Sequence, residues 1–145
     1  MIRRILVVCV GNICRSPIGE GLLRARLPGV EICSAGTAAL VGEPAHPLSI
    51  AAAAELGIDI SAHRATQLTA ALIRRADLVL TMDAAQKREI IAGYPFATGR
   101  VYRIGEQDRV DVPDPYRQPV DRFRHARSLI ERGVNAWVPK IDALR

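Results

Sequence analysis

Six consecutive apolar residues, Ile5 to Val10, lead directly into Gly11 and Asn12, and a helical pattern follows over 17–27. A short, unbroken apolar run predicts a strand buried on both faces, which is typical of a parallel sheet. Ser16 is a candidate N-cap for the helix, and Pro17 suits its first position. A buried strand followed at once by a helix is the opening unit of an α/β fold.

Apolar runs and helical patterns alternate along the rest of the chain. Pro139 is expected to kink or break the last helix. The order predicts a single-domain, three-layer α/β/α fold with a four-stranded parallel sheet and helices on both faces. Ligands of such sheets bind at the carboxyl ends of the strands. The remaining predicted strands cover 30–34, 77–81 and 101–104, and the helices 49–56, 69–75, 83–92 and 120–144, with loops at 37–47 and 111–119.

The composition fits one globular domain over residues 1–145, with 49% hydrophobic and 24% charged residues. No apolar run approaches the ~18 residues of a membrane span, and the first residues lack a signal-peptide cleavage pattern. We therefore expect no membrane insertion. The chain has three cysteines, an odd number that favours a reducing compartment, and we expect the cytoplasm.

The net charge of +5 suits an anionic substrate and would also suit nucleic acid. However, the basic residues are spread along the chain, and aromatic residues make up only 4%, which leaves little for stacking bases. We expect no nucleic-acid partner. No group of Cys and His has the spacing of metal ligands, so neither a metal nor a cofactor is expected.

The turn between the first strand and helix reads Cys-Val-Gly-Asn-Ile-Cys-Arg-Ser over residues 9–16. Gly11 and Asn12 tolerate left-handed backbone geometry, which can aim successive N–H groups at an anion. The helix N-terminus adds positive potential. Cys9 at the mouth of such a nest is expected to be a thiolate. The planar fork of Arg15 matches two oxygens of a phosphoryl group.

Two simpler interpretations of this loop compete with a catalytic one. Cys9 could be an inert buried cysteine and Arg15 a surface charge, which for a lone cysteine is the commoner case. The other compatible residues in the loop make that interpretation the weaker one. A loop that binds phosphate without chemistry stays open. There is no Gly-Lys-Ser/Thr, so a nucleotide-binding loop of the Walker type is not indicated.

A second candidate element is Asp114, which lies between Pro113 and Pro115. A residue before proline is held out of the helical region, so the loop is stiff and presents one carboxyl group. Tyrosinate as a leaving group has a pKa near ~10, and protonating it in the transition state should help by roughly 10²–10⁴-fold. Taken alone, Asp-Pro is most often an ordinary turn. Together with the Cys9 loop, it is a candidate general acid.

The stretch from Val8 to Pro17 resembles the signature loop of the low-molecular-weight protein-tyrosine phosphatases, and Asp114-Pro-Tyr116 resembles their general-acid loop. The resemblance implies a flavodoxin-like fold of the phosphatase I type and hydrolysis of phosphotyrosine through a phosphocysteine. Residues 34–42 and 113–117 are similar to the bacterial branch, nearest to enzymes that act on tyrosine autokinases of capsule and exopolysaccharide export. Phosphotyrosine proteins, and such a kinase among them, are therefore the expected partners.

The resemblance also implies roles for individual residues. Cys9 would be the nucleophile, Arg15 the phosphate clamp, and Asp114 first acid and then base. Cys14 matches a cysteine that forms a reversible disulfide with the nucleophile under oxidation. The other implied site residues are Val10, Gly11, Asn12, Ile13, Cys14 and Ser16 around the phosphate, with Ser16 donating to Cys9; Ser34 and His63 in a network with Asn12; Asp83 supporting Arg15; and Tyr116 and Leu40 on opposite rims of the pocket.

Two other functions remain as alternatives. An arsenate reductase of the same fold uses a similar Cys-x5-Arg loop but relays electrons through further cysteines after the third strand. This chain has no cysteine beyond Cys33, and it has Asp114-Pro-Tyr, so both facts favour a phosphatase. A non-catalytic phosphotyrosine-binding module would not need nucleophile, clamp and acid together. We expect a monomer or weak dimer.

Overall fold

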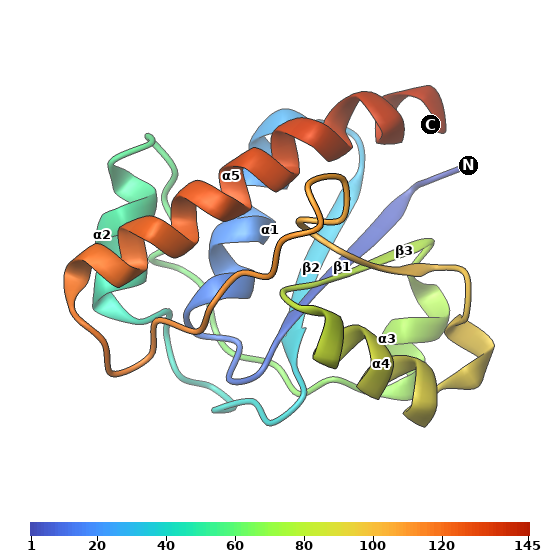
Figure 1. Cartoon of the computed structure of the whole chain (residues 1–145), viewed down its shortest axis with the longest axis horizontal. Coiled ribbons are helices and arrows are strands. Elements are labelled where there is room, and N and C mark those ends of the chain that lie inside the picture. Colours follow the sequence, from blue (N-terminus) through green and yellow to red (C-terminus); the bar gives the residue numbers. More distant parts are fainter.

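The computed structural model describes all of residues 1–145, and Figure 1 shows a sheet enclosed between two groups of helices. The strands are β1 (Arg4–Cys9), β2 (Glu31–Gly36), β3 (Leu78–Thr81) and β4 (Val101–Arg103). They lie in the order β2-β1-β3-β4, and every pair is parallel. The helices are α1 (Arg15–Arg26), α2 (Pro47–Ala54), α3 (Ala70–Arg75), α4 (Ala84–Gly93) and α5 (Val120–Ala143), with a short 3-10 turn at Pro95–Ala97.

Alternating side chains of β1 divide the hydrophobic core into two layers. Ile5 and Val7 lie in the larger cluster, together with side chains of α1 and α5. Leu6 and Val8 lie in the smaller cluster, with side chains of α3 and α4. All four are fully buried. The predicted doubly covered strand and the α/β/α architecture with a four-stranded parallel sheet are therefore confirmed.

The carboxyl ends of the three longer strands meet at one edge of the sheet. Cys9 pairs with Gly36, and Val8 pairs with Thr81. A Cβ atom added at Gly36 would lie 2.4 Å from the carbonyl oxygen of Val10 and 3.0 Å from the nitrogen of Asn12. Only glycine allows the end of β2 to approach the Cys9 loop this closely.

The predicted start of the first helix is wrong. Helix α1 begins at Arg15, and Cys14 in the N-cap position makes no side-chain capping bond. Ser16 is thus the second helical residue and Pro17 the third. The Ser16 hydroxyl does not cap the helix because it bonds instead to the side chains of Cys9, the last residue of β1, and Asn12 in the loop that follows.

Of the kink or break predicted at Pro139, the break does not occur, because α5 continues through this residue to Ala143. Proline removes one backbone N–H donor from the helix. Two neighbours on the buried face, Val138 and Ile141, belong to the larger core cluster, and Ile141 is fully buried. Their burial outweighs the missing hydrogen bond so close to the helix end.

Smaller shifts affect the predicted boundaries. Helix α2 begins at Pro47, two residues before the predicted start, because His46 Nδ1 accepts a hydrogen bond from the N–H of Leu48 and caps the first turn. Asp83 and Thr69 cap α4 and α3 in the same way, each with a side-chain oxygen. None of the helices combines the length and the apolar character that a membrane span requires.

Candidate active site

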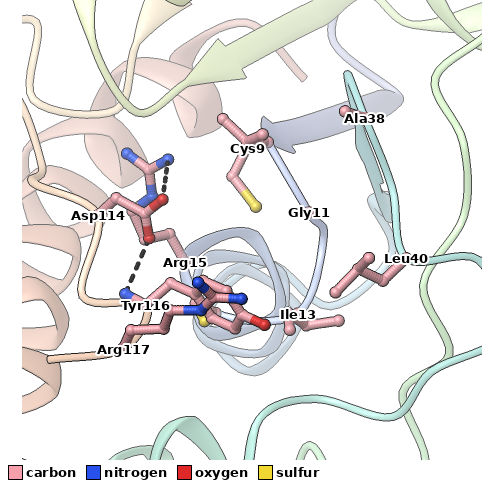
Figure 2. A pocket seen from close by; sticks show the side chains of 11 residues that line it. Cys9, Gly11, Ile13, Arg15, Ala38, Leu40, Asp114, Tyr116 and Arg117 are labelled. Carbon is pink, nitrogen blue, oxygen red and sulfur yellow. Dashed lines mark hydrogen bonds and ion pairs between the residues drawn. The ribbon is translucent and has the colours of Figure 1, made fainter.

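Cys9, the last residue of β1, lies in a cavity of about 300 Å³ at the carboxyl edge of the sheet. Its side chain is 2% exposed. Figure 2 shows the sulfur pointing into this cavity, with Asp114 and Arg15 on one side and Ala38 and Leu40 on the other. The lining residues are Cys9, Val10, Gly11, Ile13, Cys14, Arg15, Ala38, Leu40, Asp114, Tyr116 and Arg117.

The loop that follows Cys9 is a row of free backbone donors. None of the N–H groups of residues 10–14 makes a hydrogen bond within the protein. The left-handed backbone predicted for this turn occurs at Asn12, with φ of 58°, and not at Gly11. Such a turn, placed before a helix N-terminus, forms an anion-binding concavity.

Asn12 fixes this loop from behind. It is fully buried, and its Nδ2 donates to Ser16 Oγ at 2.7 Å and to Ser34 Oγ at 3.0 Å. Its Oδ1 accepts from the N–H of Thr66 at 2.8 Å, and its carbonyl oxygen lies 2.6 Å from His63 Nε2. One side chain thus joins the loop to α1, to β2 and to the segment before α3. The expected grouping of Asn12, Ser16, Ser34 and His63 is present.

Ser16 is placed to donate a hydrogen bond to the Cys9 sulfur. Its Oγ lies 2.9 Å from Cys9 Sγ. Because Asn12 Nδ2 can only donate, the Ser16 oxygen accepts that bond, and its single proton is available to the sulfur. A hydroxyl pointed at the sulfur in this way stabilises a thiolate.

Glu20 is a member of this network that the sequence analysis missed. It is 8% exposed, accepts a hydrogen bond from Ser34 Oγ, and lies 3.8 Å from His63 Nδ1. Its other oxygen pairs with Arg24 at 2.7 Å. A sequence signal was available, because Glu20 follows Ser16 by four residues and therefore lies on the same face of α1.

Arg15 is a buried cation whose guanidinium is only partly occupied by the protein. Its side chain is 3% exposed, and one terminal nitrogen, NH1, donates to the carbonyl oxygen of Val112 at 2.8 Å. Asp83 and Asp114 lie 3.7 and 3.8 Å away, close enough for ion pairing but too far for hydrogen bonds. The Nε atom of Arg15 has no partner. Asp83 thus lies where a residue supporting Arg15 was expected.

Asp114 is held in an exposed loop above the cavity. Its Oδ1 accepts from the N–H of Tyr116 at 3.1 Å, and its side chain is 50% exposed. The second oxygen, Oδ2, faces Arg15 (Figure 2). Tyr116 walls the cavity, with the guanidinium of Arg117 5.3 Å from its ring centre. Arg117 and Ala38 line the cavity too, although the sequence analysis did not assign them.

Cys14 lies in the wall of the same cavity but in a different environment. It is 5% exposed. Burial above all, and then the nearby negative charge of Asp114, raises the pKa of its thiol to about 12. Cys14 is therefore a neutral thiol at physiological pH. All three cysteines are free, and no three His, Cys, Asp or Glu side chains gather as a metal site would require.

Comparison with known proteins identifies the class to which this fold and site belong. Residues 4–145 match the family model for low molecular weight phosphotyrosine protein phosphatases. The chain is therefore a member of that family, and it is a phosphatase.

Particular relatives agree with this. A probable low molecular weight protein-tyrosine-phosphatase, EpsP of Ralstonia solanacearum, is 56% identical over 144 residues and covers 99% of each chain. The low molecular weight protein-tyrosine-phosphatase Wzb of Escherichia coli K12 is 40% identical, covering 99% of this chain and 98% of its own. The structure of Vibrio vulnificus Wzb in complex with benzylphosphonate superposes with a TM-score of 0.93 at 41% identity, over 97% of this chain and 99% of that one.

Proposed function

We propose that this phosphatase hydrolyses phosphotyrosine through a phosphocysteine intermediate, with Cys9 as nucleophile, Arg15 as phosphate clamp and Asp114 as general acid and base. The main support is the row of unpartnered donors around Cys9, which comprises the N–H groups of residues 10–14 and Nε of Arg15. Backbone N–H groups rarely remain unpaired in folded proteins. A row of them beside a buried guanidinium suits the oxygens of a phosphoryl group.

In the first step, the Cys9 thiolate attacks phosphorus, and the bond between phosphorus and the tyrosine oxygen breaks. Asp114 gives its proton to that oxygen as it leaves. Arg15 and the loop N–H groups hold the equatorial oxygens, whose charge is stabilised in the transition state. The Ser16 hydroxyl, 2.9 Å from the sulfur, stabilises the thiolate by a hydrogen bond.

In the second step, Asp114 acts as a carboxylate and takes a proton from water. The water oxygen attacks phosphorus, the bond between sulfur and phosphorus breaks, and inorganic phosphate leaves. The Cys9 thiolate is regenerated, and Asp114 is protonated for the next cycle. The half-exposed side chain of Asp114 suits this step because water reaches it.

The depth of the cavity supports tyrosine over serine as the phosphorylated residue. Cys9 is almost fully buried, whereas Tyr116 and Leu40, which line the same cavity, are partly exposed. A phosphorylated aromatic side chain is long enough to bring its phosphate to the buried sulfur while packing against these walls. The side chain of phosphoserine is shorter, so the backbone of its peptide would contact the rim of the cavity before the phosphate reached the sulfur. We expect phosphotyrosine peptides to be hydrolysed and phosphoserine peptides to be poor substrates.

The mechanism is tested with substitutions at the proposed nucleophile and acid. Cys9→Ser should abolish turnover of phosphotyrosine peptides and retain binding of inorganic phosphate. Asp114→Asn should lower kcat/KM for the peptide by roughly 10²–10⁴-fold and kcat/KM for p-nitrophenyl phosphate much less, since kcat/KM reports the first step and that leaving group needs little protonation. Cys33→Ser is the matched control, because Cys33 is a free cysteine that does not line the cavity. Turnover by the Cys9→Ser variant would sink the mechanism.

Cys14 also suggests oxidative control of this site. Peroxide would oxidise the Cys9 thiolate to a sulfenic acid, and the Cys14 thiol would condense with it to a disulfide, releasing water. Both side chains line one cavity. Mild peroxide should inactivate the enzyme reversibly, and mass spectrometry should find a Cys9–Cys14 bridge in the inactive form. Inactivation without that bridge contradicts this proposal.

The sequence likeness of residues 34–42 and 113–117 to the bacterial branch supports a narrower role. We propose that residues 1–145 act as one phosphatase domain, as a monomer or weak dimer in the cytoplasm, where the free cysteines stay reduced. A bacterial tyrosine autokinase of polysaccharide export is the proposed substrate. Purified phosphorylated autokinase should lose its phosphotyrosine on incubation with the wild-type enzyme and keep it with Cys9→Ser.

A further inference from the structure

Asp111, three residues before Asp114, ties the start of the acid-bearing loop to two other parts of the fold. A single carboxylate oxygen, Oδ1, accepts a hydrogen bond from the N–H of Ala84 at 3.1 Å and another from Arg103 at 3.0 Å. Ala84 is the first residue of α4, and Arg103 is the last residue of β4. Asp111 is outside the cavity and contacts none of its lining residues through these bonds.

Arg103 is itself held firmly. Its side chain is 16% exposed and also bonds to Glu106, whose carboxylate accepts from the Arg103 N–H as well. The carbonyl oxygen of Arg103 accepts from Trp137 Nε1 at 3.1 Å. The hydrogen bond to Asp111 is the main cause that raises the pKa of Arg103 above its ordinary value. The anchor of Asp111 is therefore fixed to β4, to the following turn and to α5.

The other anchor of Asp111 belongs to the segment that faces the phosphate clamp. Asp83, one residue before Ala84, lies beside Arg15. Val112, one residue after Asp111, donates its N–H to the carbonyl of Met82 at 2.8 Å, and its own carbonyl accepts from Arg15. Residues 82–84 therefore interact both with Arg15 and with the first residues of the loop that carries Asp114.

We propose that Asp111 is a positioning residue that sets the place of Asp114 relative to Arg15 and the leaving oxygen. This rests on the proposed function, in which Asp114 is the general acid. Only Pro113 separates the fixed residues 111–112 from Asp114, and proline transmits position because its φ is locked. Asp114 makes no bond of hydrogen-bonding length outside its own turn, so its placement depends on the residues before it.

The test measures how the rate depends on the leaving group in the full-length enzyme. In Asp111→Ala, kcat/KM for phenyl phosphate and phosphotyrosine peptide should fall about tenfold, while kcat/KM for p-nitrophenyl phosphate should change less than about twofold, because kcat/KM reports the step in which the leaving group departs. A displacement of 1 Å at a reacting group can cost about 10²-fold, and the remaining bonds of Val112 should limit the movement. Asp111→Asn keeps an acceptor for the Ala84 N–H and should lose less than the Ala variant.

The matched control is Asp108→Ala. Asp108 lies in the same connection between β4 and α5 and pairs with Arg132 at 3.2 Å; its side chain is 43% exposed and that of Asp111 is 53% exposed, so the two carboxylates are similarly accessible. Its side chain makes no hydrogen bond or ion pair with α4 or with the residues next to Asp114. Its replacement should leave the dependence on the leaving group as in the wild type. If Asp108→Ala changed the dependence on the leaving group as much as Asp111→Ala does, any substitution in the segment between β4 and α5 would have this effect. That result would overturn a specific role for Asp111.

A double-mutant cycle separates positioning from a general structural role. In an Asp114→Asn background, adding Asp111→Ala should bring no further loss with phenyl phosphate. A further tenfold loss there, or an equal loss with phenyl and p-nitrophenyl phosphate in the single variant, overturns the proposal while leaving the proposed function intact. If Asp114→Asn itself showed no dependence on the leaving group, the acid assignment would fail and this proposal with it.

Discussion

Replacing Gly36 by alanine is the sharpest test of how the fold positions the loop that follows Cys9. The added Cβ would lie 2.4 Å from the carbonyl oxygen of Val10 and 3.0 Å from the nitrogen of Asn12. Neither contact is with a flexible side chain, so the backbone must move. Since ordinary contact begins at 3.4 Å, the loop or the end of β2 has to shift by about 1 Å.

The size of the effect follows from that shift. Overpacking of this kind costs about 1–3 kcal/mol, which for a chain of this length lowers Tm by roughly 2–12 °C. Misplacing the reacting groups by 1 Å should lower kcat/KM by about 10²-fold. The loss of activity should therefore exceed what the small unfolded fraction at 25 °C explains.

The assay compares kcat/KM for p-nitrophenyl phosphate with the midpoint of urea unfolding in the same preparation. Gly93→Ala is the control, because a Cβ there meets no atom within 4 Å and Gly93 ends α4 at an ordinary φ. It should retain full activity and gain at most about 1 kcal/mol of helix propensity. Gly36→Ala with kcat/KM within twofold of the wild type would refute the reasoning.

Three further outcomes follow from the structure. Because burial raises the pKa of Cys14 to about 12, it stays protonated up to pH 9, and iodoacetamide should modify Cys9 well before Cys14, as peptide mass spectrometry will show. Glu20→Ala should lower the free energy of unfolding by about 1–3 kcal/mol in urea, since the buried Ser34 hydroxyl loses its acceptor. Pro139→Ala should raise Tm, because an alanine restores an N–H within α5 and removes a penalty of up to about 3 kcal/mol; an unchanged or lower Tm would show that the proline is not strained there.

The sequence was sufficient for the sheet and for the chemistry-bearing side chains. The short apolar run from Ile5 to Val10 predicts a buried strand, and β1 covers nearly the same residues, Arg4–Cys9. The cysteine, arginine and aspartate of the proposed mechanism could be picked out because their residue types and spacing are typical of phosphate chemistry. The structure brings Cys9, Arg15 and Asp114 to one cavity, as the sequence led us to expect.

What the sequence could not show are bonds made by backbone atoms and choices between partners. The carbonyl of Val112 binds Arg15, and the N–H of Thr66 binds Asn12. Every residue type can make such backbone contacts, so the sequence does not predict them. Ser16 has the right type for a helix cap, but a sulfur and an amide compete for its hydroxyl in three dimensions. Pro139 is a helix breaker by propensity, and only the burial around it reveals why the helix continues.

The residues that line the cavity extend along the chain from Cys9 to Arg117, and this separation determines when the site can form during protein synthesis. A ribosome adds roughly 5–20 residues each second, so Cys9 is synthesised on the order of 5–20 s before Asp114. Throughout that interval the growing chain contains Cys9 but lacks both Asp114, the proposed acid, and the carbonyl of Val112 that accepts a hydrogen bond from Arg15. Turnover therefore begins only when nearly the whole chain exists and has folded. Recovery of activity during refolding should accordingly report the last event of folding rather than the first.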